Sequence, residues 1–194
     1  GKEHVHRRPE KTDSLQEPQE QRRVTQRCQG AADIADEKDE KDDYIVSDGI
    51  DALVKVCNPE DIYEYVKPFM KRESHRNVVM GSVINALKIS HKYKSDERIK
   101  TYFKEIAFGI DIPSRLRVDA IHALKSFAKD EDVKILAKKY IGFNARYVKQ
   151  ELIALLGESQ DKSYVEFLTE IKKNTSDQRI YKSLSEAIKK LNGN

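Results

Sequence analysis

The chain has 194 residues, of which 36% are charged and 38% hydrophobic, and its formal net charge is +3. It contains no run of eighteen apolar residues, so we expect no membrane span in this chain, and its length suffices for one repeat domain and a tail. Because the chain begins with Gly1 rather than methionine, we expect a processed form and leave open a removed signal peptide or membrane anchor. The compartment stays open between the cytoplasm and, after such processing, the periplasm.

Residues 1–43 form the first predicted region, a polar tail or linker. They contain few aliphatic or aromatic residues, and a run of mixed charges extends from Asp36 to Asp43. Such a segment buries too little apolar surface to offset the entropy lost on ordering, so we expect it to be disordered or at most locally helical. The tail carries nine Lys or Arg against twelve Asp or Glu, whereas residues 44–194 carry 27 against 21. The second predicted region, residues 44–194, is therefore basic.

A helical pattern recurs five times along residues 44–194, at intervals of 31 to 37 residues. Each copy contains an alanine followed by an aliphatic residue, with apolar residues at positions −7 and −3 relative to the alanine, where only Gly49 and Glu151 break the apolar rule. Positions −7, −3, 0, +1 and +4 share one side of an α-helix. We name these predicted helices the B helices. Their alanine pairs are Ala52-Leu53, Ala86-Leu87, Ala123-Leu124, Ala154-Leu155 and Ala187-Ile188.

A second apolar pattern precedes each of the last four B helices, so the sequence predicts pairs of an A helix and a B helix. Asn58 before Pro59 is a typical helix start, with a capping residue followed by proline at the first helical position. A two-helix unit of this length cannot bury its apolar face alone and must stack on its neighbours. The A-helix patterns extend over Ile62–Met70, Ile99–Ile106, Val133–Tyr140 and Val165–Ile171.

Two segments carry a resemblance to the HEAT and HEAT-like repeat family. Val66–Met70 resembles the A-helix core of that family with its mid-helix proline, here Pro68, and Leu116–Leu124 resembles its B-helix signature. The resemblance covers about residues 44–191 and concerns the fold alone. It implies an all-α fold, a right-handed α-solenoid of about four to five antiparallel helix pairs, in which the B helices line the concave surface. Membership would imply a binding scaffold and no particular chemistry.

No residue pattern points to catalysis, so we expect a protein that is not an enzyme and has no cofactor and no metal. The five histidines show no arrangement typical of metal ligands or of a catalytic triad, and no phosphate loop or nucleophile elbow is present. Cys57 is in phase with Leu53 on the apolar side of the first B helix, and Cys28 lies in the polar tail. We therefore expect Cys57 to be a small core residue and expect no disulfide framework.

Basic residues recur on the side of the B helices opposite the apolar stripe. At positions −8, −5, −1 and +2 of the last four B helices, eight of sixteen residues are Lys or Arg and only Glu186 is acidic. Solvation of a lysine-rich surface explains part of this pattern, and a basic track for a negatively charged partner is the functional alternative. The candidate partner-binding residues are Lys88, Arg115, Val118, His122, Lys125, Arg146, Lys149, Ile153, Leu156, Arg179, Lys182 and Lys189.

These observations favour a non-catalytic adaptor that binds an acidic protein segment on its concave B-helix surface. Arg115, Arg146 and Arg179 would bind carboxylates, and Val118, Ile153 and Leu156 would supply an apolar anchor. Binding to a nucleic-acid backbone by the same residues is the first alternative, although no stacking aromatic residue interleaves the basic positions. The second alternative is the soluble part of a cell-envelope assembly, with residues 1–43 as the tether. A small-molecule substrate is not expected.

Overall fold

The computed structural model describes residues 19–36, 43–71, 77–143 and 145–193. All regular elements within these residues are helices, which confirms the all-α prediction for the described part of the chain. None of the described helices combines the length and the apolar character that a membrane crossing requires. The helices are α1 (Gln19–Asp36), the B helices α2 (Asp43–Val56), α4 (Asn77–Ile89), α6 (Ser114–Leu124), α8 (Arg146–Glu158) and α10 (Gln178–Leu191), and the A helices α3 (Pro59–Val66), α5 (Glu97–Phe108), α7 (Glu131–Tyr140) and α9 (Tyr164–Lys173).

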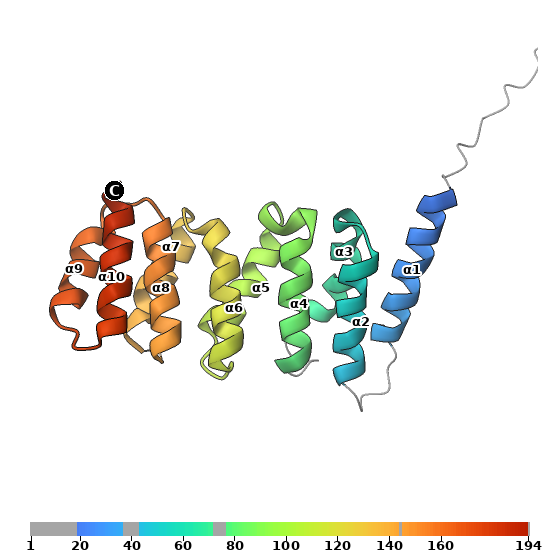
Figure 1. Ribbon diagram of the computed structural model, residues 1–194, viewed down its shortest axis with the longest axis horizontal. Helices are drawn as coiled ribbons and strands as arrows, with labels where there is room; N and C mark the ends of the chain where they lie inside the picture. The colour runs from blue at the N-terminus through green and yellow to red at the C-terminus, as the bar shows by residue number, and fades with distance from the viewer. Residues whose placement is uncertain (1–18, 37–42, 72–76, 144, 194) are drawn as a thin grey trace, which may run out of the picture.

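The helices form an elongated two-layer row (Figure 1). In the front layer the B helices lie side by side in chain order, so that α2 packs on α4, α4 on α6, α6 on α8 and α8 on α10. The A helices lie behind them, where α3 packs on α4, α5 on α6, α7 on α8 and α9 on α10. All five B helices therefore point the same way and begin along one edge of the row (Figure 1).

The sequence signals for helix starts are used in the structure. Pro59 occupies the first turn of α3, where its missing N–H is not needed. The side chain of Asp96 accepts a hydrogen bond from the N–H of Arg98, and that of Asp177 accepts two at the start of α10. Pro68 does not interrupt a longer α-helix, because α3 ends at Val66 and a 3₁₀ turn, η1 (Lys67–Met70), follows.

The predicted register of the fourth B helix is wrong by one residue. The repeat pattern assigned Tyr147 and Glu151 to the apolar stripe of α8, but Tyr147 is 59% exposed. The buried stripe of α8 instead starts at Val148 and continues through Leu152 and Leu155. The sequence pattern assigns Ala154-Leu155 to the motif because it is an alanine followed by an aliphatic residue. In the structure, Leu155-Leu156 occupies the position on the helix that the motif pair holds in the other copies. The misfit of Glu151 with the apolar rule was the visible sign of this shift.

The helix α1, which lies within the predicted tail of residues 1–43, packs on the first B helix of the row. Residues 1–18 and 37–42 of the predicted tail lie outside the described residues, but α1 packs along α2. Among its described side chains, the buried ones are small, namely Cys28, Ala31 and Ala35. A Cβ atom added at Gly49 of α2 would lie 2.9 Å from both the Cβ and the N atom of Ala35, so glycine permits this close helix contact.

Cys28 and Cys57 form a disulfide, contrary to our expectation that Cys57 is a simple core residue. Their Cα atoms are 5.3 Å apart, within the usual range of about 4.4–6.8 Å for bonded cysteines. The prediction failed because it treated residues 1–43 as unstructured, so no second cysteine was expected near Cys57. The bond joins the middle of α1 to the residue that follows the end of α2.

Ion pairs connect successive A helices in a ladder. The ammonium of Lys100 on α5 lies 2.9 Å from a carboxylate oxygen of Asp130, at the start of α7, and that of Lys134 on α7 lies 2.7 Å from Asp161, before α9. Each lysine comes four residues after the acidic residue that precedes its own helix, so Lys100 follows Asp96 and Lys134 follows Asp130. The residue at the equivalent position of α9 is Val165, so this ladder stops at the last pair.

Candidate protein-interaction face

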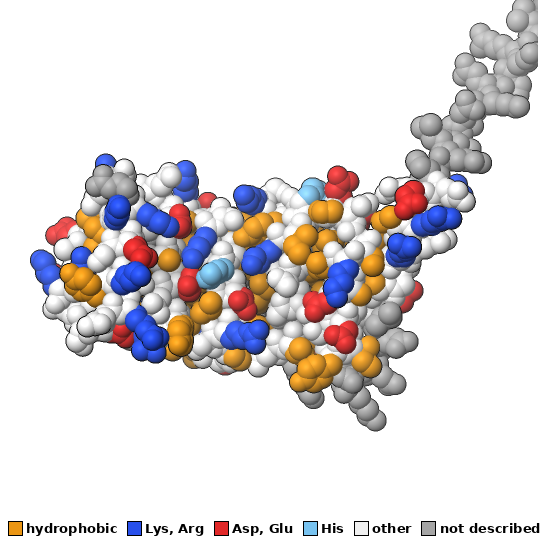
Figure 2. All heavy atoms as spheres, viewed as in Figure 1, with side chains coloured by type: hydrophobic (Ala, Val, Ile, Leu, Met, Phe, Trp, Pro, Cys, Tyr) orange, Lys and Arg blue, Asp and Glu red, His pale blue; other side chains and the backbone are white. Residues whose placement is uncertain are grey.

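The exposed side of the B helices, which we call the B-helix face, carries most of the predicted partner-binding residues. Figure 2 views the molecule from this side and shows basic, acidic and apolar side chains interspersed along the row. Two grooves cross the face, one at each half of the row. Their linings and the exposed charges around them define the candidate site.

The first groove lies between α2, α4 and α6 and has a volume of about 630 Å³. Gly81 opens its floor, because a Cβ atom at that position would reach to 3.5 Å from Leu116. Both signs of charge line the groove, together with two amide side chains that can donate and accept hydrogen bonds. The polar lining residues are Ser47, Asp51, Asn77, Ser82, Asn85, Lys88, Arg115 and Asp119.

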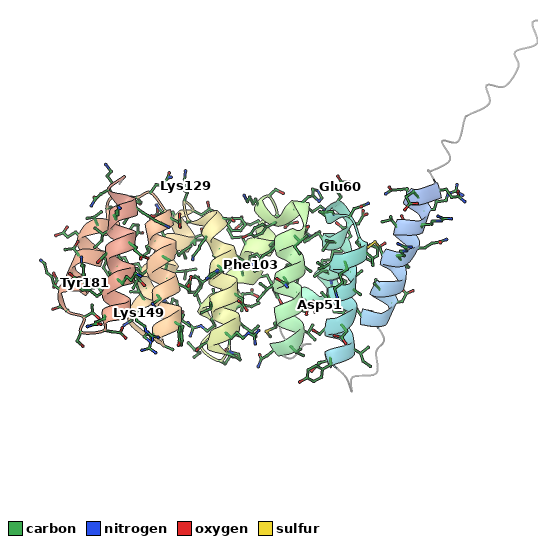
Figure 3. All side chains as sticks on the ribbon, viewed as in Figure 1. Asp51, Glu60, Phe103, Lys129, Lys149 and Tyr181 are labelled. Atoms are coloured by element: carbon green, nitrogen blue, oxygen red, sulfur yellow. A yellow bond between two sulfur atoms is a disulfide. The ribbon has the colours of Figure 1, made fainter. Side chains whose placement is uncertain are left out.

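A buried hydrogen bond fixes the wall of the first groove. The hydroxyl oxygens of Ser47 on α2 and Ser82 on α4 lie 2.8 Å apart, and both residues are buried. A satisfied polar pair between two helices sets their relative register, because sliding one helix would leave a hydroxyl without a partner. This wall of the groove is therefore fixed. Asp51, labelled in Figure 3, lies four residues after Ser47 on α2 and also lines the groove.

The second groove lies between α6, α8 and α10 and has a volume of about 260 Å³. Val118 forms its wall on α6, Tyr147 and Ala154 line it on α8, and Glu186 lines it on α10. Tyr147 and Ala154 reach this groove because of the one-residue shift in register. Further polar residues of the lining are Gln150, Glu151, Ser183 and Lys190.

A three-residue charge cluster borders the second groove. One carboxylate oxygen of Glu151 lies 2.7 Å from Nζ of Lys125 and 2.8 Å from Nε2 of His122. Burial alone would raise the pKa of the Glu151 carboxyl by desolvation, but the hydrogen bonds and positive charges of Lys125 and His122 outweigh it and lower the pKa. Glu151 is thus a carboxylate at neutral pH and neutralises part of the predicted basic track.

Three arginines begin three consecutive B helices. Arg115, Arg146 and Arg179 lie in the first turns of α6, α8 and α10, and all three are exposed. The guanidinium of Arg146 stacks over the ring of Tyr147, 5.4 Å from its centroid, and also lies 3.9 Å from Asp177. We call these three residues the arginine row. The arginine row lies along the edge of the molecule where the B helices begin (Figure 1).

The structure separates the predicted residues other than Ile153 and Leu156 into three groups. Lys88, Arg115 and Val118 line the grooves, and His122 and Lys125 flank the second groove through their contacts with Glu151. Figure 3 shows Lys149 in the half of α8 that is nearer its start. The third group lies outside the two groove linings and consists of Arg146, Lys149, Arg179, Lys182 and Lys189. In the described residues, no ion pair is found for the lysines of this group.

Ile153 and Leu156 cannot form the predicted apolar anchor. Both are completely buried in α8, because the shift in register turns them toward the core. The residues that reach the face in their place are Tyr147 and Ala154. Glu151 gave a signal for this exchange, since a charged residue in a buried stripe indicates a misplaced register.

Two further observations describe the chemistry of the candidate site. Among the described residues, no group of three His, Cys, Asp or Glu side chains is placed to hold a metal ion. The comparisons with family models, curated proteins and solved structures give no match. The resemblance to HEAT-like repeats therefore stays a prediction from the sequence.

Proposed function

We propose that the chain is a non-catalytic interaction scaffold that binds an acidic protein segment on its B-helix face. In this proposal the row of helix pairs is a right-handed, HEAT-like α-solenoid. The arginine row is the observation that carries the proposal. Three guanidinium groups at one edge of three adjacent helices can hold successive carboxylates of a single extended chain.

The helix starts strengthen the attraction for carboxylates. A guanidinium presents a planar fork of N–H donors that matches a carboxylate. The first N–H groups of an α-helix have no partner within the helix, and the helix dipole places positive potential there. This applies to α6 and α8, which have no side-chain cap, whereas at α10 the Asp177 carboxylate already accepts from the N–H groups of Arg179 and Ile180. Stacking on Tyr147 holds the guanidinium of Arg146 in a fixed plane, which reduces the entropy lost on binding.

The grooves supply the remaining specificity. Val118 and Ala154 offer a small apolar surface in the second groove, and the amides of Asn77 and Asn85 in the first groove can pair with an extended backbone. Asp51 and Asp119 line the same groove as Lys88 and Arg115. The favoured partner is therefore an extended segment whose carboxylates meet the arginine row and whose other side chains are mostly uncharged.

Affinity capture with the full chain tests this proposal. The test variant carries Arg115→Glu, Arg146→Glu and Arg179→Glu, and the matched control carries Lys94→Glu, Lys129→Glu and Lys162→Glu. The control lysines are exposed and precede α5, α7 and α9, and Lys129 lies at the opposite edge of the row from the helix starts (Figure 3). Both variants change the net charge by the same amount.

We expect mass spectrometry to show acidic partners with the wild type and the control, and their loss with the arginine variant. Recovery of the same partners by all three proteins would contradict the proposal. A gel shift with duplex and single-stranded nucleic acid separates the alternative. Binding that weakens steeply with salt and disappears in the arginine variant, without any captured protein, would favour a nucleic-acid partner instead.

A further inference from the structure

The described side chains that α1 buries against α2 are small. Cys28, Ala31 and Ala35 are buried on α1, while the rest of its described surface is largely polar or charged. By contrast, the terminal helix α10 buries Ile180, Leu184 and Leu191. Because buried apolar area sets the strength of such contacts, the described side chains of α1 gain less from packing than those of α10 do.

Two points hold α1 in an antiparallel arrangement on α2. At one end, Ala35 contacts Gly49 so closely that a Cβ atom at Gly49 would clash with it. At the other end, the disulfide joins Cys28 to Cys57. Between the contact at Gly49 and the disulfide lies the buried Leu53 of α2. The disulfide is thus the only covalent link that adds to the connecting residues 37–42.

The disulfide has no alternative pairing within the chain, which contains only two cysteines. It closes a loop with a sequence separation of 29 residues. A cross-link of this kind keeps the two helices at high effective concentration and reduces the entropy of the separated state. Cys28 is buried and Cys57 is partly exposed, so the bond borders solvent on the Cys57 side.

We propose that Cys28–Cys57 is a redox site that controls whether α1 caps the N-terminal end of the helical row. In the oxidised protein α1 is docked on α2. A dithiol reductant transfers two electrons and two protons, so that the S–S bond breaks, Cys28 and Cys57 become thiols, and the two thiols of the reductant join in a disulfide. In the reduced protein α1 separates from α2, while the row from α4 to α10 keeps its packing.

Hydrogen exchange of the full chain, with and without dithiothreitol, tests the proposal. Alkylation and intact mass establish the state of the two thiols in each sample. We expect amides of residues 19–36 to exchange at least about tenfold faster after reduction, because their protection depends on docking. Amides of α4 to α10 are expected to change by less than about twofold. A variant with Cys28→Ser and Cys57→Ser is expected to match the reduced wild type without any reductant.

Three results would overturn the proposal. The first is equal protection of α1 in the oxidised and reduced protein, since packing alone would then hold the helix. The second is faster exchange throughout α4 to α10, since α1 would then not be a separate unit. The third is an effect of dithiothreitol that the serine variant fails to reproduce, since another action of the reductant would then explain it.

Discussion

The two ends of the helical row are completed in different ways. At the C-terminal end, Ser185 of α10 takes the place that Ile121 and Ile153 hold in α6 and α8, and Val165 ends the ion-pair ladder. The last pair thus differs at both positions from the two pairs before it. At the N-terminal end an added helix, α1, covers α2 and is fixed there by a disulfide.

This difference shows that one repeated architecture can end by substitution or by addition. Substitution leaves the terminal helix firmly attached, because the apolar stripe of α10 remains intact. Addition leaves a helix whose attachment depends on a covalent bond and on close contact of small residues. We therefore expect the C-terminal end to share in global stability and the N-terminal end to open separately.

Among the substitutions that test this comparison, we expect Leu184→Ala to cause the largest loss in the free energy of unfolding. Leu184 is completely buried in α10, and removal of such a side chain costs about 2–5 kcal/mol through lost burial and a cavity. Denaturant unfolding of the whole chain measures the change, with Lys182→Ala on the exposed side of α10 as the control. A loss below about 1 kcal/mol would show that α10 is not part of the cooperative unit.

Two glycines permit a sharper comparison, because their surroundings are nearly the same. A Cβ atom at Gly157 would lie 2.9 Å from Cα and Cβ of Ala187, just as one at Gly49 would meet Ala35 at 2.9 Å. We expect Gly157→Ala to separate α8 from α10 and to lower the global free energy of unfolding by about 1–3 kcal/mol.

Gly49→Ala is expected to displace α1 with a smaller global loss. Hydrogen exchange of residues 19–36 and denaturant unfolding, measured on the oxidised protein, separate the two effects. The comparison fails if Gly49→Ala lowers global stability as much as Gly157→Ala does, since α1 would then unfold together with the row.

We expect acid to weaken the ion-pair ladder between the A helices before it weakens the attachment of α1 to α2. Hydrogen bonds lower the pKa of Asp161 to about 2. The bond from Lys134 has the largest effect, and the bonds from Ser163 have the next largest. A carboxyl whose pKa is depressed on folding contributes stability above its unfolded pKa, near 3.8, and loses that contribution as the pH falls through the folded pKa. Wild-type stability should therefore decline between about pH 4 and pH 2.

Asp161→Asn removes this contribution, so we expect the variant to be less stable than the wild type above about pH 4 and to approach it at about pH 2, which gives a shallower decline over the same interval. Glu166→Gln, at an exposed carboxylate of α9, serves as the control. Unfolding curves at several pH values measure both. Equal pH dependence in the wild type and Asp161→Asn would remove the ladder as a source of acid sensitivity.

Hydrophobic periodicity predicted the elements that large apolar residues hold together. The stripes containing Leu87, Leu124 and Leu184 are buried as expected, because a helix with one apolar side must pack that side. The order of A and B helices followed from the same pattern. The predicted register of α8 is wrong because Ala154 matches the motif in residue type but not in its position on the helix. The neighbouring Leu residues fit an apolar stripe in either of two registers, so they do not decide between them.

The contacts of α1 could not be predicted from apolar periodicity. Ala31, Ala35 and Cys28 add little hydrophobicity to a polar segment, and the close approach at Gly49 is a property of two backbones in space. Gly49 was visible as an exception in the first B helix, but nothing in that pattern indicated which segment required it. The charge cluster of Glu151, Lys125 and His122 escaped for a similar reason, since it joins two different helices.

Hydrogen exchange of the oxidised chain with and without a captured acidic partner tests the central claim most directly. The first-turn amides of α6 and α8 have no partner within their helices and no side-chain cap, so they report on a ligand at the arginine row, whereas the amides of Arg179 and Ile180 in α10 already donate to Asp177. The account predicts protection at the starts of α6 and α8 and along the two grooves, with α5, α7 and α9 unchanged. Protection confined to the A helices, with the starts of α6 and α8 unaffected, would contradict it.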